Sequence, residues 1–498
     1  MRPGIYSIGF DVGSSSVKGA LLDIETGTTT ASALFPRDEM PIHSPHPGWA
    51  EQDPDSWWQC LREVTRALLT VAPEAARHVR SIGISYQMHG LVVTDREGNP
   101  LRPAIIWCDS RAVDIGNRAS ASLGEEYCLT HCLNLPGNFT ASKLRWVREH
   151  QPALYDRIAR VLLPGDYIAL RMTGEPTTTV TGLSEGIFWD FLTGSLAHRV
   201  LDHYQIAQDL LPRLVPAIGI QGELTSAAAE ELGLPAGTPV SYRAGDQPNN
   251  AFSLNVLEPG EAATTAGTSG VVYGVTDSLI PDPRSRVNLF AHVNHTVERR
   301  RLGILLCING TGILYSWLRT MMGPRTSYPE LNTLAAGVAV GSEGLSVLPF
   351  GNGAERILEN RAPGCSIHGL DFLRHSQGHL LRAAQEGIAF SFRHGMTIME
   401  AMGMKPAVIR AGHANLFLSP VFRETLANIT GAAIELYETD GAAGAARGAA
   451  LGIGAYGNSR EAFRSLRRIG IVEPRADLVG PTLAAFDRWS QRLNATLA

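Results

Sequence analysis

The chain has 498 residues, of which 43 are Lys or Arg and 48 are Asp or Glu, and its formal net charge at pH 7 is −5. Hydrophobic residues make up 44% of the chain, which is enough to bury a large core and excludes global disorder. The mild acidity argues against a nucleic-acid polymer as partner, because neutralising phosphates needs clustered cations. The six scattered cysteines exclude a disulfide scaffold and suit a reducing, cytoplasmic compartment. No apolar run of about 18 residues is present, so no membrane partner is expected.

Three apolar, β-rich runs open the chain, and the turns between them predict a β-meander. The runs cover residues 5–12, 17–24 and 28–35, and the first turn is Gly13-Ser14-Ser15-Ser16. Residues 53–69 carry apolar side chains at helical spacing behind an early proline and predict a helix. Residues 79–85 predict a short buried strand. Strands and helices continue to alternate, which favours an α/β fold.

The same hairpin pattern recurs about half a chain later. A predicted strand at residues 239–244 ends at Gly245-Asp246, and a new meander follows around the turn Gly267-Thr268-Ser269-Gly270. Length alone suggests roughly three domains. The repeated hairpin predicts two instead, covering residues 1–255 and 256–498.

Small residues dominate the C-terminal part. Residues 407–410, 420–430 and 432–437 predict a strand, a helix and a strand, and residues 441–454 predict a helix rich in glycine. Each Gly in a helix costs roughly 0.5–1 kcal/mol relative to Ala. Several of them indicate either that another backbone or a ligand approaches the helix closely or that the helix simply packs tightly, and the sequence leaves both open.

The two hairpin turns are the first candidate site. Backbone N–H groups in tight turns of small residues form concave anion sites, and Ser or Thr hydroxyls add donors. One such turn is usually only a turn, but a corresponding pair predicts a clamp for a polyphosphate. Asp11, at the end of the first strand, is a candidate Mg²⁺ ligand, because this cation needs only one or two carboxylates beside a phosphate. The alternative for Asp11 is turn capping. Lys18 is a weaker candidate for the same site.

Asp246 is the candidate general base. In phosphoryl transfer to a hydroxyl, a carboxylate accepts the proton while the rest of the protein mainly positions the reacting groups. A loop Asp that only forms a turn is about equally expected. Gln87, Met88 and His89 follow the strand at residues 79–85, at an edge where α/β sheets place ligands, and could contact a sugar. Trp107 lies in another aromatic and polar loop, which would line the same cleft or brace it.

Together these residues resemble the FGGY family of carbohydrate kinases over nearly the whole chain. The loop Gln87-Met88-His89-Gly90 is similar to the sugar-site motif of the xylulokinase branch. The other stretches that carry the resemblance are residues 8–18, 46–54, 139–147, 245–246, 267–270 and 379–387.

The resemblance implies two ribonuclease-H-like domains of the actin-like ATPase type that close over a cleft. It also implies phosphoryl transfer from ATP to D-xylulose, with Asp246 taking the proton of the terminal hydroxyl and Asp11 holding Mg²⁺. The sugar contacts that it implies are Met88 and His89, to which the loop positions of Gln87 and Trp107 add two further candidates. The ATP contacts that it implies are Gly13, Ser14, Ser15, Lys18, Gly267, Thr268, Ser269, Gly412 and Asn415.

Three stretches differ from the family pattern. Ala411-Gly412-His413-Ala414-Asn415 stands where the family commonly has three glycines, and Asp246-Gln247 stands where Asp-Asn is usual. Gly353-Ala354-Glu355-Arg356-Ile357 stands where the xylulokinase branch usually has Gly-Glu-Arg-Thr-Pro. These differences keep another ketopentose or polyol open as acceptor, such as ribulose, fuculose or gluconate. A second interpretation is a non-catalytic protein of the actin-like ATPase fold, which would need neither the sugar loop nor Asp246. The sequence is compatible with a homodimer and does not decide the oligomeric state.

Overall fold

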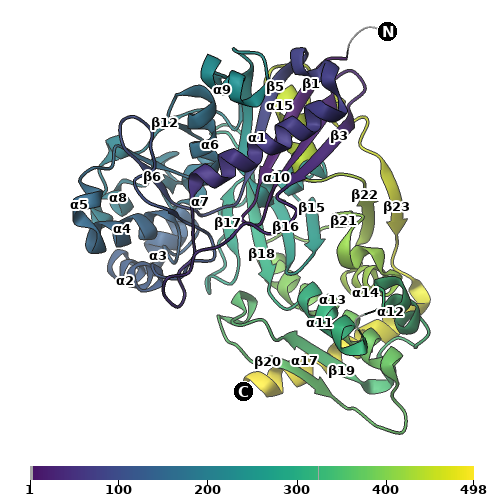
Figure 1. The fold of residues 1–498 in the computed structure, drawn as a ribbon. Coiled ribbons are helices and arrows are strands. Elements are labelled where there is room, and N and C mark those ends of the chain that lie inside the picture. Colours follow the sequence, from purple (N-terminus) through teal and green to yellow (C-terminus); the bar gives the residue numbers. More distant parts are fainter. Residues whose placement is uncertain (1–3, 324) are drawn as a thin grey trace.

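The computed structural model describes residues 4–323 and 325–498 of the chain. These residues form two large sheets, each with helices packed against it (Figure 1). The first sheet has the strand order β13-β14-β5-β1-β2-β3, and the second has the order β17-β18-β16-β15-β21-β22-β23. Among the described residues, no helix combines the length and apolar character needed to cross a membrane.

The first sheet is built around the predicted N-terminal meander. Its strands are β1 (Tyr6–Val12), β2 (Val17–Asp23), β3 (Thr28–Phe35), β5 (Val79–Tyr86), β13 (Ile218–Glu223) and β14 (Pro239–Gly245). β1 pairs antiparallel with β2 and parallel with β5, and β5 pairs parallel with β14. Helix α1 (Pro54–Val71) packs against β2 and β3 through the apolar stripe that predicted it, with Trp57, Leu61 and Leu68 fully buried.

The second sheet repeats this arrangement. Its strands are β15 (Ala262–Ala266), β16 (Gly270–Thr276), β17 (Asn288–Ala291), β18 (Leu302–Ile308), β21 (Val408–Gly412), β22 (Ala433–Tyr437) and β23 (Arg468–Val472). β15 pairs antiparallel with β16 and parallel with β21, as β1 does with β2 and β5. The predicted duplication of the hairpin is therefore confirmed.

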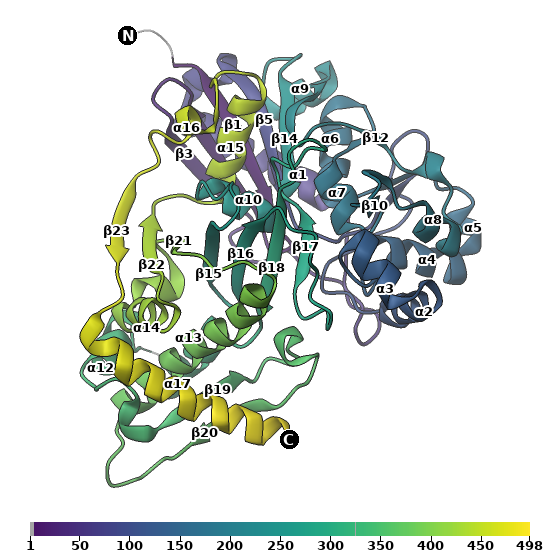
Figure 2. The ribbon, with the colours of Figure 1, turned by 180° about the vertical axis from the view of Figure 1, so that it is seen from behind.

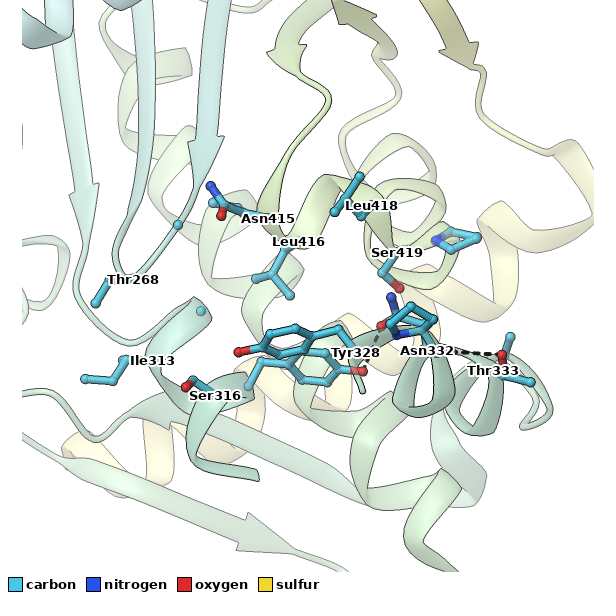
Figure 3. A pocket seen from close by; sticks show the side chains of 17 residues that line it. Thr268, Ile313, Ser316, Tyr328, Asn332, Thr333, Asn415, Leu416, Leu418 and Ser419 are labelled. Carbon is cyan, nitrogen blue, oxygen red and sulfur yellow. Dashed lines mark hydrogen bonds between the residues drawn. The ribbon is translucent and has the colours of Figure 1, made fainter. Parts of the chain in front are cut away.

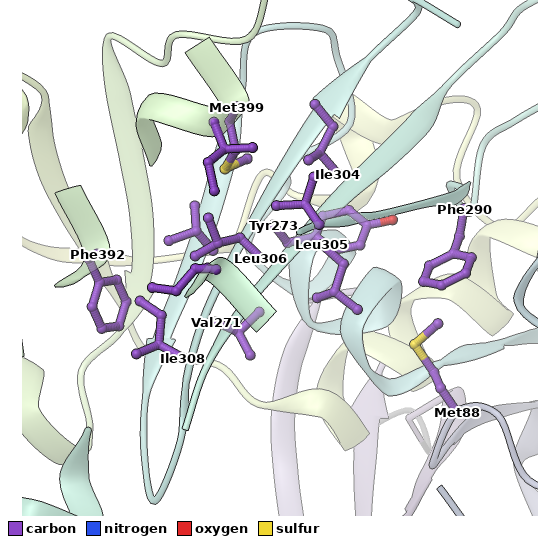
Figure 4. Packing of buried hydrophobic residues seen from close by; sticks show 14 of the residues in the cluster. Met88, Val271, Tyr273, Phe290, Ile304, Leu305, Leu306, Ile308, Phe392 and Met399 are labelled. Atoms are coloured by element: carbon purple, nitrogen blue, oxygen red, sulfur yellow. The ribbon is translucent and has the colours of Figure 1, made fainter. Parts of the chain in front are cut away.

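The core of the second sheet is a contiguous apolar layer (Figure 4). Buried side chains of β16 and β18, among them Val272 and Leu306, pack against α13 (Gln377–Ala401) through residues such as Phe392 and Met399. Fully burying one such side chain stabilises the fold by about 1.5–3 kcal/mol. Helices α12 (Tyr328–Ala336), α14 (Pro420–Thr430) and α17 (Ala476–Leu497) pack around α13.

The remaining elements connect and flank the sheets. Between β5 and β13 a lobe emerges to one side of the first sheet (Figure 1). It contains β6 (Val92–Thr94), β7 (Ala104–Ile105), α2 (Val113–Leu123), α3 (Glu125–Tyr127), α4 (Thr140–His150), α5 (Pro152–Tyr155), β8 (Arg160–Leu162), α6 (Pro164–Thr173), β9 (Thr177–Thr178), α7 (Val180–Glu185), β10 (Trp189–Asp190), β11 (Ser195–Leu196), α8 (His198–Tyr204) and β12 (Arg213–Leu214). Elsewhere lie β4 (Glu51–Gln52), α9 (Ser226–Leu232), α10 (Asp246–Ser253), α11 (Gly312–Met322), β19 (Ser346–Phe350), β20 (Gly364–His368) and α16 (Ser459–Ala462).

The glycine-rich helix α15 (Gly441–Gly452) lies on the first sheet, although it follows β22 of the second sheet in sequence (Figure 2). Backbones meet there without intervening side chains. A Cβ on Gly9 of β1 would lie 2.1 Å from the carbonyl oxygen of Ala442, and one on Gly83 of β5 would lie 2.0 Å from that of Ala445. On the helix itself, a Cβ on Gly452 would lie 2.0 Å from the carbonyl oxygen of Ser241 of β14. Another backbone therefore approaches the helix closely, which is the first of the two explanations that the sequence left open. The division of the chain at residue 255 stays a prediction.

Candidate functional site

Three parallel strands bring the predicted site residues to one edge of the first sheet. Asp11 lies on β1 opposite Ser85 of β5, and Gly245 of β14 lies opposite Tyr86. The loop that begins at Gln87 and the helix that begins at Asp246 therefore leave the sheet side by side. The Ser85 hydroxyl donates to Asp11 Oδ1 at 2.8 Å, which fixes the orientation of that carboxylate.

Asp246 is half-buried at the first position of α10. Burial, and next the negative charge of Asp11, raise the pKa of Asp246 to about 7, although hydrogen bonds from Gln247 oppose the shift. A carboxyl group with a pKa near neutrality is suited to take up a proton at neutral pH.

The surroundings of Asp11 fit a divalent cation. Burial raises the pKa of Asp11, the negative charge of Asp440 adds to the rise, and Ser85 and Lys18 oppose it. A Cβ on Gly441 would lie only 2.4 Å from Asp11 Oδ2, so the first turn of α15 reaches this carboxylate. Among the described residues no cluster of three or more potential ligands exists. The Asp11 carboxylate, with Asp440 near it, suits Mg²⁺, because this cation binds through one or two carboxylates and keeps several waters.

The first predicted phosphate turn has its carbonyl groups tied back into the protein. Gln52 Nε2 donates to the Ser14 carbonyl at 2.6 Å, and the Met40 N–H donates to the Ser15 carbonyl at 2.7 Å. Because the peptide unit is planar and trans, the N–H groups that follow these carbonyls point to the opposite side. The exposed Trp107 donates from Nε1 to Ser14 Oγ at 3.3 Å, so this predicted sugar residue lies beside the phosphate turn.

The second predicted phosphate turn is held in the same way. The Gly267 and Thr268 carbonyls accept hydrogen bonds from the N–H groups of Gly312 and Ile313 at 3.0 and 3.1 Å. The loop before α11 is in turn fixed by the fully buried Glu355, whose carboxylate accepts the N–H groups of Asn309 and Gly310, each at 3.0 Å. In both sheets the hairpin turn is thus constrained so that the amides after the bonded carbonyls, those of Ser15, Ser16, Thr268 and Ser269, donate to no described residue, while the Gly13 N–H donates to the Ser16 carbonyl at 3.0 Å.

A cavity of about 730 Å³ begins at the second turn and runs between α11, α12 and the segment before α14 (Figure 3). The predicted residues Gly267, Thr268 and Asn415 line it. No described residue of the first turn does, and Gly412 lies at the end of β21, three residues before Asn415. The full lining is Ala266, Gly267, Thr268, Gly312, Ile313, Tyr315, Ser316, Tyr328, Pro329, Asn332, Thr333, Ala336, Asn415, Leu416, Leu418, Ser419 and Pro420.

A buried polar network closes the far end of this cavity. The Tyr315 hydroxyl donates to Asn332 Oδ1 at 2.8 Å and accepts from Gln385 Nε2 at 2.7 Å, while Ser419 Oγ donates to Gln385 Oε1 at 2.6 Å. Sequence reasoning missed Tyr315, Asn332 and Ser419 as lining residues. Gln385 falls in residues 379–387, which the family resemblance marked without assigning this position a role.

The predicted sugar loop is partly packed into the protein. Gln87 is buried and its Nε2 donates to Gln52 Oε1 at 3.3 Å, while Met88 packs against Gly245. His89 has a positive φ of 61°, and its ring lies 4.9 Å from the Phe139 ring and 5.2 Å from the Phe290 ring, between centroids. Phe290 belongs to β17 of the second sheet and faces Met88 across the space between the two sheets (Figure 4).

Comparison with known proteins agrees with this geometry. The family model "FGGY family of carbohydrate kinases, N-terminal domain" matches residues 6–253, and the C-terminal counterpart matches residues 262–456. The xylulose kinase of Escherichia coli (strain K12) is 31% identical over 445 residues, covering 89% of this chain and 88% of that protein. The L-xylulose/3-keto-L-gulonate kinase of the same strain is 32% identical over 480 residues, covering 93% and 91%.

Among solved structures, the xylulose kinase from Rhodospirillum rubrum superposes with a TM-score of 0.87 at 27% identity and covers 99% of both chains. The predicted α/β architecture of two actin-like domains is confirmed. The chain is a sugar phosphotransferase that belongs to the FGGY family of carbohydrate kinases.

Proposed function

We propose that this protein transfers the γ-phosphoryl group of ATP to the terminal hydroxyl of D-xylulose, giving D-xylulose 5-phosphate and ADP. The observation that carries the proposal is the convergence of Asp246, Asp11 and the loop of His89 at one sheet edge. Similarity to xylulose kinases supports the choice of sugar.

In this proposal the Asp246 carboxylate accepts the proton of the terminal hydroxyl as the sugar oxygen attacks the γ-phosphorus. The new O–P bond forms while the bond from phosphorus to the bridging oxygen of ADP breaks. The amides of the turns at residues 13–16 and 267–270 bind phosphate oxygens from opposite sides. Asp11, through water or directly, would hold Mg²⁺, which when bound offsets the charge of the phosphates. The cavity beyond Thr268 takes the nucleoside.

Release of ADP measured in a coupled assay tests the proposal. D-xylulose, L-xylulose, ribulose, fuculose, gluconate and a sugar-free blank should be compared at saturating ATP and Mg²⁺. We expect the highest kcat/KM with D-xylulose and little turnover in the blank. A clear preference for another acceptor would contradict the choice of D-xylulose, and turnover that no sugar stimulates would contradict sugar as the acceptor.

L-xylulose or a related keto-sugar acid is the second candidate acceptor. The observation in its favour is the 32% identity to the L-xylulose/3-keto-L-gulonate kinase over 93% of this chain. The same assay separates the two sugars, because D-xylulose and L-xylulose are both in its panel. They differ only in configuration, so a difference in kcat/KM reports how the site recognises that configuration.

The pH dependence of the reaction should follow the ionisation of Asp246. A general base acts only when unprotonated, and the pKa of Asp246 is raised to about 7 by burial and by Asp11. We expect kcat/KM for the sugar to fall by about tenfold per pH unit below that value and to level off above it. Bound Mg²⁺ would move the bend to lower pH, because a cation favours the carboxylate. The residual rate of Asp246→Asn should lack this bend, and an unchanged acid limb in that variant would contradict the assignment.

Lys143 joins the two loops of the sugar site. It is fully buried on α4, and its Nζ donates to the carbonyl oxygens of His89 at 2.7 Å and Ile106 at 3.0 Å. Burial lowers the pKa of Lys143 to about 7, although Asp109 opposes the shift. Because Ile106 precedes Trp107, one side chain aligns both predicted sugar loops.

Lys143→Met should therefore raise KM for the sugar by roughly 5- to 100-fold, since two buried carbonyls lose their donor. KM for ATP should change little, because Lys143 touches neither phosphate turn. Arg145→Met, on the same helix, is the matched control: its side chain bonds Glu149 and Tyr204 instead. Steady-state kinetics with each substrate varied in turn measures both constants. Equal rises in the two KM values would show a general loss of structure instead.

A further inference from the structure

The ring of His89 is bound to the protein through only one nitrogen. Nδ1 lies 3.1 Å from the backbone carbonyl oxygen of Glu185, at the end of α7. A carbonyl oxygen only accepts hydrogen bonds, so Nδ1 must carry the hydrogen. Nε2 has no hydrogen-bond partner among the described residues and is not one of the buried unpartnered atoms, so it reaches open space.

The ring is neutral at physiological pH. Burial, and next the positive charges of Lys143 and Arg356, lower the pKa of His89 to about 3, although the bond to Glu185 opposes the shift. A neutral imidazole carries one hydrogen, and with that hydrogen on Nδ1 the other nitrogen presents only a lone pair.

The orientation of the ring is fixed from several sides. The Phe139 ring meets it nearly edge-on, at an interplanar angle of 71°, and the Phe290 ring lies against it at 49°. The backbone beneath is held in its left-handed conformation by α4, since Thr140 Oγ1 donates to the Gly90 carbonyl at 3.2 Å and Lys143 donates to the carbonyl of His89 itself. Rotation of the ring would break its bond to Glu185.

We propose that His89 is held as its Nδ1–H tautomer by the Glu185 carbonyl, so that Nε2 acts only as a hydrogen-bond acceptor and selects a hydroxyl group of the acceptor sugar. The assignment of the ring to the sugar rests on the proposed function. At the position that it faces, the site would reject a carbonyl, an ether oxygen or a deoxy carbon. A carbonyl or ether oxygen there would set two lone pairs against each other, and a deoxy carbon would leave Nε2 without a donor.

Nitrogen-15 NMR of the histidine-labelled full chain tests the tautomer without relying on activity. His89→Gln identifies the His89 resonances by their disappearance. We expect the hydrogen on Nδ1 and a lone pair on Nε2. His292 is the internal reference for the opposite tautomer, because its Nε2 lies 3.0 Å from the Val256 carbonyl oxygen and must carry the hydrogen. A hydrogen on Nε2 of His89 would overturn the proposal.

Deoxy sugars test the selection. In each sugar of a series, one hydroxyl other than the phosphorylated one is replaced by hydrogen. The wild-type protein should lose roughly 10- to 100-fold in kcat/KM with one member of the series. In His89→Ala that member and the parent sugar should react about equally well, while the other members keep their wild-type ratios.

An undiminished penalty for every deoxy sugar in His89→Ala would overturn the role of Nε2 in selection. If no sugar stimulates ATP turnover in the wild-type protein, the proposed function fails instead, and the NMR result still decides the tautomer.

Discussion

Replacing Asp246 by Asn should lower kcat by roughly 10²- to 10⁴-fold, the range that a positioned general base contributes. The amide has almost the same shape as the carboxyl group but cannot accept the proton of the attacking hydroxyl. Asp246 is held at the first position of α10 by β14, so the substitution should leave the backbone in place. Affinities for the sugar and for ATP, measured by calorimetry, should therefore change much less than kcat, measured by ADP release.

Asp477→Asn is the matched control for this substitution. Asp477 also lies in the first turn of a helix, α17, but at the surface, where it pairs with Arg475. That variant should keep wild-type kcat. If Asp246→Asn retained kcat within about tenfold of wild type, another group would have to take the proton.

Adding a methyl group to Gly9 or Gly83 should lower the free energy of unfolding more than any other substitution predicted above. The new Cβ would lie about 2 Å from a carbonyl oxygen of α15 in each case, and that obstacle is backbone that cannot rotate away. Overpacking of a core typically costs about 1–3 kcal/mol, and an obstacle of backbone atoms places Gly9→Ala and Gly83→Ala at or above the upper end. Equilibrium unfolding in denaturant measures the free energy of unfolding.

Gly480→Ala is the control for these glycine substitutions. Gly480 lies inside α17, and a Cβ there would meet nothing within 4 Å. Ala loses less backbone entropy in a helix than Gly, but a Cβ directly before Pro481 is disfavoured in helical conformation. The two effects oppose each other, so the free energy of unfolding should change by less than about 1 kcal/mol. If Gly9→Ala or Gly83→Ala behaved like Gly480→Ala, α15 would not be packed as closely as described.

The local elements and the site edge could be predicted from the sequence because their signals are local. Apolar runs broken by small-residue turns predicted the two hairpins. Each of Asp11, His89 and Asp246 was recognised singly at or after the end of a predicted strand, and the parallel pairing that brings them together was seen only in the structure. Their roles remain predictions, as do those of the nucleotide residues.

Residues brought in from distant segments could not be predicted. Phe290 reaches the loop of His89 from the other sheet, and its place depends on how the two halves pack together, which no periodicity encodes. Tyr315 and Asn332 meet Gln385 only because α11, α12 and α13 pack together. The hydrogen bond from His89 to Glu185 joins residues that are 96 positions apart in the sequence. It is accepted by a backbone carbonyl, which every residue type has, so the sequence could not indicate it.

The path of α15 has a mechanical consequence. The chain leaves the second sheet after β22, lies on the first sheet as α15, and returns to the second sheet at β23. Any rotation of the two sheets against each other must therefore be absorbed by residues 438–440 before this helix, by residues 453–467 after it, which include α16, and by the connection between α10 and β15. The first of these segments leads into Gly441, in contact with Asp11. The candidate metal ligand on the first sheet thus lies against one of the segments that any such rotation must bend, whereas the residues that line the nucleoside cavity belong to the second half and would move with the second sheet.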